Sequence, residues 1–176
     1  MTLNIVSFIL FYFLIINCTI GYGYLTVHLY KLEHKYFNHG YLGLLGIFTL
    51  LFISYITHFF VPHNYIHNIF LLVIGFISFI YFNKKKKNLN KINILFLILF
   101  ISFLLIKAHD DFPYYHFPYT YYLTQNNLLV GIGNFNHGFR TPSSIFFLNS
   151  IFYLPIIKYY FFHIGAILIM GYSSFI

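Results

Sequence analysis

The sequence predicts an all-α, multi-pass membrane protein with about five transmembrane spans and one outer loop. Of its 176 residues, 60% are hydrophobic and only 7% are charged, whereas a soluble domain carries roughly 25% charged residues. The apolar residues also form long uncharged stretches, which is typical of helices whose solvent is lipid. Disordered chains are poor in aromatic residues, so the 25 Phe and 18 Tyr exclude that class.

Five stretches are expected to be transmembrane helices. The first carries no charge, and at about 1.5 Å per helical residue it is long enough to cross a bilayer core of roughly 30 Å. Pro62 ends the second stretch, because proline cannot continue a helix. The fourth is short, but Lys91 and Lys107 flank it and can extend their ammonium groups to the headgroups. The predicted spans are residues 3–24, 41–61, 65–82, 92–106 and 159–176.

The lysines predict the orientation. Short cytoplasmic loops collect Lys and Arg, which places the run Lys84–Lys87 inside. Alternation of the spans then puts Lys31 and Lys35 on the same side, in agreement with the same rule. We therefore expect a membrane protein whose lysine-rich loops lie on the inner side. It has three parts, which are four spans with short loops in residues 1–107, an extracytoplasmic loop in 108–158, and a fifth span, expected to be truncated, in 159–176.

The outer loop is predicted to contain one short helix. Thr141 followed by Pro142 fits an N-cap and a first helical position. Residues 143–154 then form a helix that is too short to span the membrane and that stops near Pro155. We expect this helix to lie in the membrane interface.

Two of the three carboxylates of the chain are adjacent, at Asp110 and Asp111, where the fourth span leaves the membrane. Ionisable groups near membrane depth are costly and tend to be functional. A carboxylate here can act as a general base toward an attacking hydroxyl, or the pair can bind a divalent cation such as Mg²⁺ or Mn²⁺ through oxygen. The alternative is that the aspartates only mark the point where the helix leaves the lipid.

The two aspartates are expected to differ in role. Side chains at adjacent helical positions diverge by about 100°, so they do not face the same point. Pro113 disfavours the helical conformation of the residue before it, which frees Asp111 to point into the loop. Asp111 is therefore predicted to be the reacting carboxylate and Asp110 the supporting one.

A second candidate feature lies between residues 131 and 144, which hold three glycines and the only arginine, Arg140. Glycine permits close approach of the backbone to a ligand, and Arg140 could bind a phosphate through two parallel hydrogen bonds. The segment is not a dinucleotide fingerprint, because no strand precedes it. A flexible loop whose arginine meets lipid headgroups is the alternative.

The cysteine and histidine content indicates no redox centre. Cys18 is the only cysteine, so neither a disulfide nor a cysteine metal site can form within the chain. His58, His63 and His67 lie close in sequence near the second loop, but a haem-binding bundle would place histidines deep in two facing helices. We interpret them as interfacial polar residues. No nucleic-acid partner is expected, because no folded basic surface accompanies the lysine run.

Residues 107–155 resemble the first large outer loop of multi-pass bacterial membrane glycosyltransferases of the GT-C superfamily. The likeness rests on the run from Lys107 through His109, Asp110, Asp111 and His116 and on the run from Gly133 through Arg140 to Ser150. It implies a protein of the bacterial inner (plasma) membrane that transfers a sugar from a polyprenyl-phosphate donor on the outer face. Asp110 or Asp111 matches the acidic motif of the superfamily, whose aspartate is taken as the catalytic base or metal-site acid.

On this hypothesis His109 and His116 assist at the substrate. Arg140 matches no universal residue of the superfamily, so its contact with the donor phosphate is our own inference. GT-C enzymes usually have many more spans, so we expect the chain to be the N-terminal part of such an enzyme. The alternative is a non-catalytic small subunit of a respiratory or transport complex, whose aromatic surfaces pack against partner helices.

Overall fold

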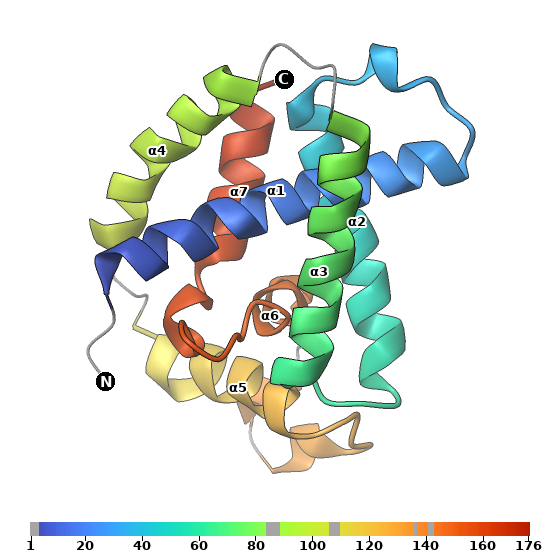
Figure 1. Ribbon diagram of the computed structural model, residues 1–176. Helices are drawn as coiled ribbons and strands as arrows, with labels where there is room; N and C mark the ends of the chain where they lie inside the picture. Colours follow the sequence, from blue (N-terminus) through green and yellow to red (C-terminus); the bar gives the residue numbers. More distant parts are fainter. Residues whose placement is uncertain (1–3, 84–88, 106–109, 136, 141–142) are drawn as a thin grey trace.

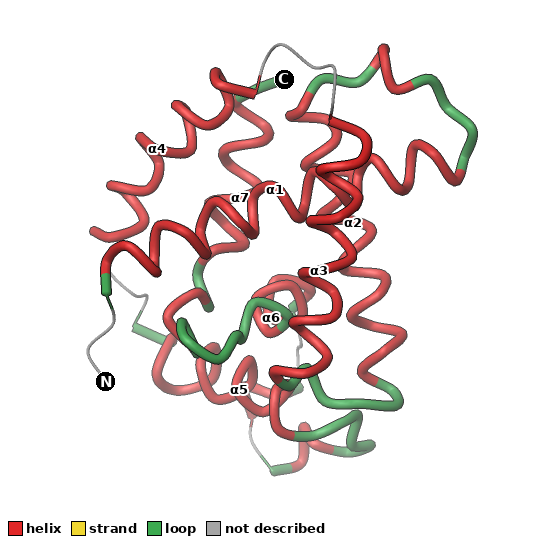
Figure 2. The backbone as a smooth tube through the Cα atoms, in the orientation of Figure 1, coloured by secondary structure: helices red, strands yellow, loops and turns green. Residues whose placement is uncertain are grey.

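The computed structural model describes residues 4–83, 89–105, 110–135, 137–140 and 143–176. These residues form helices and turns, and they contain no β-strand, only one isolated bridge between Leu154 and Lys158. The predicted all-helical class is therefore confirmed for this part of the chain (Figure 2). The α-helices are α1 (Ile5–Leu29), α2 (His39–His58), α3 (Tyr65–Phe82), α4 (Leu89–Leu105), α5 (Phe117–Gln125), α6 (Ser144–Ser150) and α7 (Ile164–Ser174).

The three long helices each begin at an asparagine. The side chains of Asn4, Asn38 and Asn64 accept hydrogen bonds from the backbone N–H groups of Val6, Tyr41 and His67, respectively. Asparagine is a favoured N-cap because its side-chain oxygen satisfies one of the free N–H groups of the first turn. Local sequence therefore sets where α1, α2 and α3 start.

Helix α1 is the centre of the fold. Figure 1 shows it running across α2 and α3 rather than alongside them, with α4 and α7 toward its amino-terminal half. Its contacts with α2 and α3 are the most extensive in the described chain. Glycines permit this crossing, because a side chain on Gly21 would overlap the Gly75 backbone of α3, and one on Gly46 of α2 would overlap the Thr19 carbonyl.

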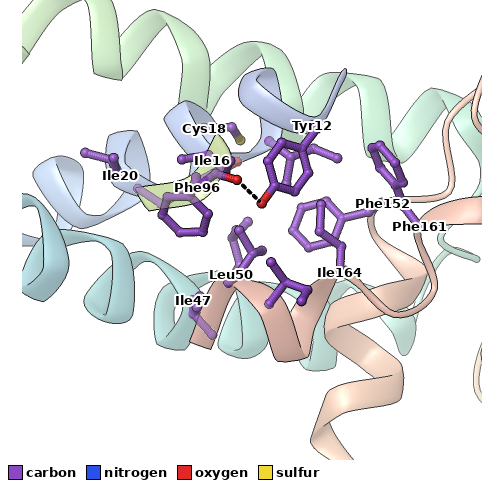
Figure 3. Close-up of a cluster of buried hydrophobic side chains, with 14 of the residues drawn as sticks. Tyr12, Ile16, Cys18, Ile20, Ile47, Leu50, Phe96, Phe152, Phe161 and Ile164 are labelled. Carbon is purple, nitrogen blue, oxygen red and sulfur yellow. Dashed lines mark hydrogen bonds between the residues drawn. The ribbon is translucent and has the colours of Figure 1, made fainter. Parts of the chain in front are cut away.

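The core is apolar and aromatic around the amino-terminal half of α1 (Figure 3). Tyr12 and Phe96 are fully buried, and the Tyr12 hydroxyl donates a hydrogen bond of 2.9 Å to the Phe96 carbonyl oxygen. This bond ties α1 to α4 and satisfies the polar tip of a buried tyrosine. Phe152 and Phe161, from the chain after α6, complete the cluster.

Three helices, α1, α2 and α3, are long and apolar enough to cross a membrane. Helices α4 and α7 are apolar but shorter. The predicted span at residues 159–176 contains only the eleven-residue α7, because Tyr159–Phe161 form a 3₁₀ turn and Lys158 before it has a φ of 45°. Helix α3 has the predicted bounds of residues 65–82.

Helix α6 differs from the expected interfacial helix at residues 143–154. It covers only Ser144–Ser150, and its residues 146–150 are all buried. Contacts with α2, α5 and α7 surround it. The apolar residues of this segment thus pack within the chain, and α6 lies between α2, α5 and α7.

Candidate functional site

A cavity of about 510 Å³ lies where the segment after Asp110 and Asp111, which we call the acidic motif, meets α6 and α7. Its wall combines aromatic faces with histidine, hydroxyl and amide groups. The lining residues are Phe112, Tyr115, His116, Thr120, Ser143, Ile145, Phe146, Asn149, Phe162, His163 and Ala166. An apolar pocket with a few converging polar groups is the usual form of a small-molecule site.

The acidic motif anchors one side of this cavity. Residues 112–116 form a single π-helical turn that leads into α5. The Asp111 carbonyl oxygen accepts hydrogen bonds of 3.1 Å from the backbone N–H groups of both Tyr114 and Tyr115. The backbone of Asp111 therefore holds the turn that presents the lining residues Phe112, Tyr115 and His116. Asp110 is exposed and Asp111 is partly exposed, and neither belongs to the cavity wall itself.

Two histidines from distant parts of the chain share the cavity. The ring centroid of His163 lies 4.2 Å from that of Phe112, and the His116 ring lies 5.1 Å from that of Phe146. Burial and the nearby His116 lower the pKa of His163 below its ordinary value. Because a proton on the His116 ring disfavours a proton on His163, His163 offers a neutral imidazole that can both donate and accept a hydrogen bond.

Asn149 connects the α6 wall to the α7 wall. Its side-chain oxygen accepts a hydrogen bond of 2.9 Å from the backbone N–H of Gly165, near the start of α7. A side chain at Gly165 would crowd this oxygen and the side chain of Ile145. The glycine therefore allows the two helices to approach closely at the cavity.

The predicted site residues fall into three groups. His116 lines the cavity, and Asp110 and Asp111 directly precede its wall. Arg140 is exposed and does not line the cavity, and its Nε donates to the Gly133 carbonyl oxygen at 3.2 Å. His109 lies outside the described residues. Among the residues that the structure describes, no three His, Cys, Asp or Glu side chains are grouped as metal ligands, and a cation at the aspartate pair stays a prediction.

Sequence reasoning missed two features of this region. His163 joins His116 only through tertiary contact, and no local pattern around it signals a site. His58 and His63, interpreted as interfacial residues, are fully buried beside α6. The sequence signal for this cluster was the spacing of His58, His63 and His67 around a turn, but spacing alone does not reveal burial.

Comparisons with known proteins identify a family. A family model described as "Domain of unknown function (DUF8201)" matches residues 5–176. This match includes all seven α-helices and the whole cavity wall. Searches of the curated proteins and of the solved structures found no match. The description of the family carries no activity, so function has to be argued from the site.

Proposed function

This chain belongs to the family described as a domain of unknown function (DUF8201), and we propose that it is a membrane glycosyltransferase of the GT-C kind. In this proposal it transfers a sugar from a polyprenyl-phosphate donor on the outer face of the bacterial inner membrane. The observation that carries the proposal is the position of the cavity. The turn held by the Asp111 backbone supplies three of its lining side chains, so the acidic motif and a cavity for a small ligand lie together.

The apolar surface supports a membrane location. Large side chains on α2, α3 and α4 are exposed, including Phe52, Phe70 and Ile101, which are 69%, 66% and 61% exposed. A soluble protein would place charged residues there, and lipid acyl chains are the natural solvent for such a surface. In the alternative function, a non-catalytic subunit of a membrane complex, helices of partner proteins would cover part of the same surface.

The residues have distinct roles in the proposed reaction. The Asp111 carboxylate takes the proton of the acceptor hydroxyl as a general base. The acceptor oxygen then bonds to the anomeric carbon of the sugar while the bond from that carbon to the phosphate oxygen breaks, and the lipid phosphate leaves with the electron pair. His116 and His163 position the substrate through hydrogen bonds inside the cavity. Asp110 supports Asp111, and the contact of Arg140 with the donor phosphate stays a prediction.

A divalent cation fits the donor set at the acidic motif. Mg²⁺ prefers oxygen ligands and is commonly held by one or two carboxylates together with the phosphates of a substrate. Asp110 and Asp111 are two carboxylates on adjacent residues that directly precede the lining residue Phe112 in the sequence. When bound there, Mg²⁺ or Mn²⁺ would neutralise charge on the leaving phosphate.

The test is a transfer assay with the chain in lipid nanodiscs that contain synthetic polyprenyl-phosphate monosaccharides. We expect Asp111→Asn to abolish transfer and Asp110→Asn to reduce it less, because asparagine keeps the shape of the side chain and removes the base. Asn127→Ala, at an exposed position of the outer loop, is the matched control and should transfer at the parental rate. Equal rates for the parent and both aspartate variants, or no transfer from any donor, would refute the proposal.

A further inference from the structure

A buried polar cluster joins α2, α3 and α6 behind the cavity. His58, His63 and Asn68 are each at most 1% exposed. The His63 ring stacks on the His67 ring at 5.0 Å between centroids, and the His58 ring lies 4.9 Å from His63. We call these four residues the histidine cluster. Buried polar groups are costly unless they are hydrogen-bonded, so the hydrogen bonds of the cluster define which protons its rings carry.

Asn68 determines the tautomer of His67. The Asn68 amide nitrogen donates to three backbone carbonyl oxygens, those of His63, Ser150 and Tyr153, at 2.7 to 2.9 Å. The amide oxygen must therefore be the atom that faces His67 Nδ1 at 2.9 Å. An amide oxygen only accepts hydrogen bonds, so His67 carries its proton on Nδ1. Its Nε2 then lies as an acceptor 3.0 Å from the Thr57 hydroxyl, which also contacts the Ile53 carbonyl oxygen at 2.9 Å.

His63 holds the opposite tautomer. Its Nε2 lies 3.1 Å from the carbonyl oxygen of Ser54 on α2. A carbonyl oxygen only accepts, so the proton of a neutral His63 is on Nε2. Its Nδ1 lies 2.6 Å from the Ser150 hydroxyl of α6 and accepts from it in this tautomer. The Phe147 carbonyl oxygen, at 2.9 Å, is the other acceptor of the same hydroxyl. One imidazole ring thus links the end of α2 to the end of α6.

Helix α6 presents its other residues to the cavity. Ile145, Phe146 and Asn149 line the cavity, while Ser150 bonds to His63 and the Phe147 ring lies edge-on to His58 at 5.5 Å. We infer that His63, as the neutral Nε2–H tautomer, is a positioning residue that holds α6 and thereby the α6 wall of the cavity. A role in the reaction rests on the proposed function, since it requires the cavity to be the substrate site.

The surroundings of His63 favour the neutral ring. The titratable groups that face it are His58 on α2 and His67 on α3. On α6, the Ser150 hydroxyl and the Phe147 ring face His63. At the end of α5, the Leu123 carbonyl oxygen accepts a hydrogen bond of 2.9 Å from the His63 backbone N–H. Burial, followed by the proximity of His67 and His58, lowers the pKa of His63 to about 3.

The tautomers can be measured directly. The full chain is labelled with ring-¹⁵N histidine and measured by NMR in detergent micelles. We expect the His63 signals to show a protonated Nε2 and an unprotonated Nδ1 from pH 8 to pH 5. At pH 8, His67 should show the reverse arrangement. A His63 ring that is protonated on Nδ1 at pH 7, whether neutral or cationic, would overturn the inference.

Variants test whether His63 positions α6. His63→Leu removes both ring hydrogen bonds, and we expect amide exchange of residues 146–150 to become about tenfold faster, as loss of a buried hydrogen bond predicts. His63→Gln restores one donor and one acceptor and should return exchange toward the parental rate. His58→Phe is the matched control. It keeps an aromatic ring, and among the described residues the ring nitrogens of His58 have no hydrogen-bond partner, so α6 should exchange as in the parent.

The transfer assay adds a functional measurement. We expect His63→Leu to raise KM with little change in kcat, and His63→Gln to restore KM. If no sugar is transferred from any donor, the proposed function fails. The ring ¹⁵N signals and the amide exchange of residues 146–150 still test whether His63 positions α6. Unchanged exchange of residues 146–150 in His63→Leu would overturn it. If His63→Leu does not fold, the ring signals of the parent and the exchange of His63→Gln remain decisive.

Discussion

The Asn68 side-chain nitrogen donates a hydrogen bond of 2.9 Å to the carbonyl oxygen of Ser150, which lies 82 residues further along the chain. The same nitrogen also contacts the carbonyl oxygens of His63 and Tyr153. Asn68 lies in the first turn of α3, and Ser150 is the last residue of α6. One buried amide therefore fastens the end of the buried helix α6 to a long apolar helix.

This relationship predicts that Asn68 is a major stability determinant. Asn68→Leu removes the amide donor from three buried carbonyl oxygens, of which that of Ser150 still accepts from the Tyr153 backbone N–H at 3.2 Å. Each buried group left unsatisfied costs roughly 1–3 kcal/mol. We expect unfolding in mixed micelles to require about 3 kcal/mol less free energy, and Asn68→Asp, which places a carboxylate against the carbonyls, to cost at least as much. Asn127→Ala, at an exposed position, serves as the control. A stability of Asn68→Leu equal to that of the parent would show that the bonds do not fasten α6.

The crossing of α1 over α2 predicts a strict size limit at Gly46. A Cβ atom at this position would overlap the carbonyl oxygen of Thr19, so Gly46→Ala must push the two helices apart. Overpacking of a tight contact costs roughly 1–3 kcal/mol, and we expect a loss of unfolding free energy in that range. Phe48→Ala, on the exposed side of the same helix, should change stability by about 0.5 kcal/mol or less. Comparable losses for the two variants would contradict the crossing.

The buried histidines predict a loss of stability in acid. The pKa of His63 is about 3 in the fold and near 6.5 in an unfolded chain. Above pH 6.5 the His63 ring is neutral in both the folded and the unfolded state, so it does not lower the free energy of unfolding. As the pH falls from 6.5 toward 3, the unfolded state binds a proton that the folded state excludes. The free energy of unfolding should then fall by up to about 1.4 kcal/mol per pH unit from His63. The lowered pKa of His163 acts in the same direction.

Unfolding measured between pH 7.5 and pH 5 checks this dependence. His63→Gln removes the titrating ring and should make the slope with pH shallower than in the parent. Helix α6 should open first in the parent, because the histidine cluster borders it. A slope that is identical in the parent and in His63→Gln would mean that His63 does not contribute to the acid sensitivity.

Cysteine labelling tests the membrane orientation. The turn at His34–Tyr36 and helix α5 lie at opposite ends of the structure (Figure 1). In a Cys18→Ser background, a cysteine at Asn126 should react with an impermeant thiol reagent from outside. A cysteine at Tyr36 should react only after the membrane is permeabilised. Both positions are exposed. Asn88, the inner position next to the lysine run, lies outside the described residues. The opposite labelling pattern would remove the outer-face site and with it the proposed transferase.

The sequence predicted one wall of the candidate site but not the wall opposite it. The sequence pointed to the segment around Asp110, Asp111 and His116, because carboxylates are scarce in an apolar chain and two of them are adjacent. The structure places a cavity directly after that motif. The partner histidine, His163, belongs to the opposite wall, and its role depends on how α7 packs against the turn at residues 112–116. Arg140, which was predicted to bind a phosphate because of its guanidinium group, does not line the cavity.

The helical class and the approximate course of the three long helices follow from the uncharged stretches alone. Only α3 has the predicted bounds, whereas α1 (Ile5–Leu29) runs past the predicted residue 24 and α2 (His39–His58) ends before the predicted residue 61. The crossing of α1 over α2 and α3, the burial of α6 and the contact of His63 with Ser150 depend on tertiary packing and could not be predicted. Lipid and a protein interior are equally apolar. Hydropathy therefore shows that a segment avoids water, but not whether lipid or another helix covers it.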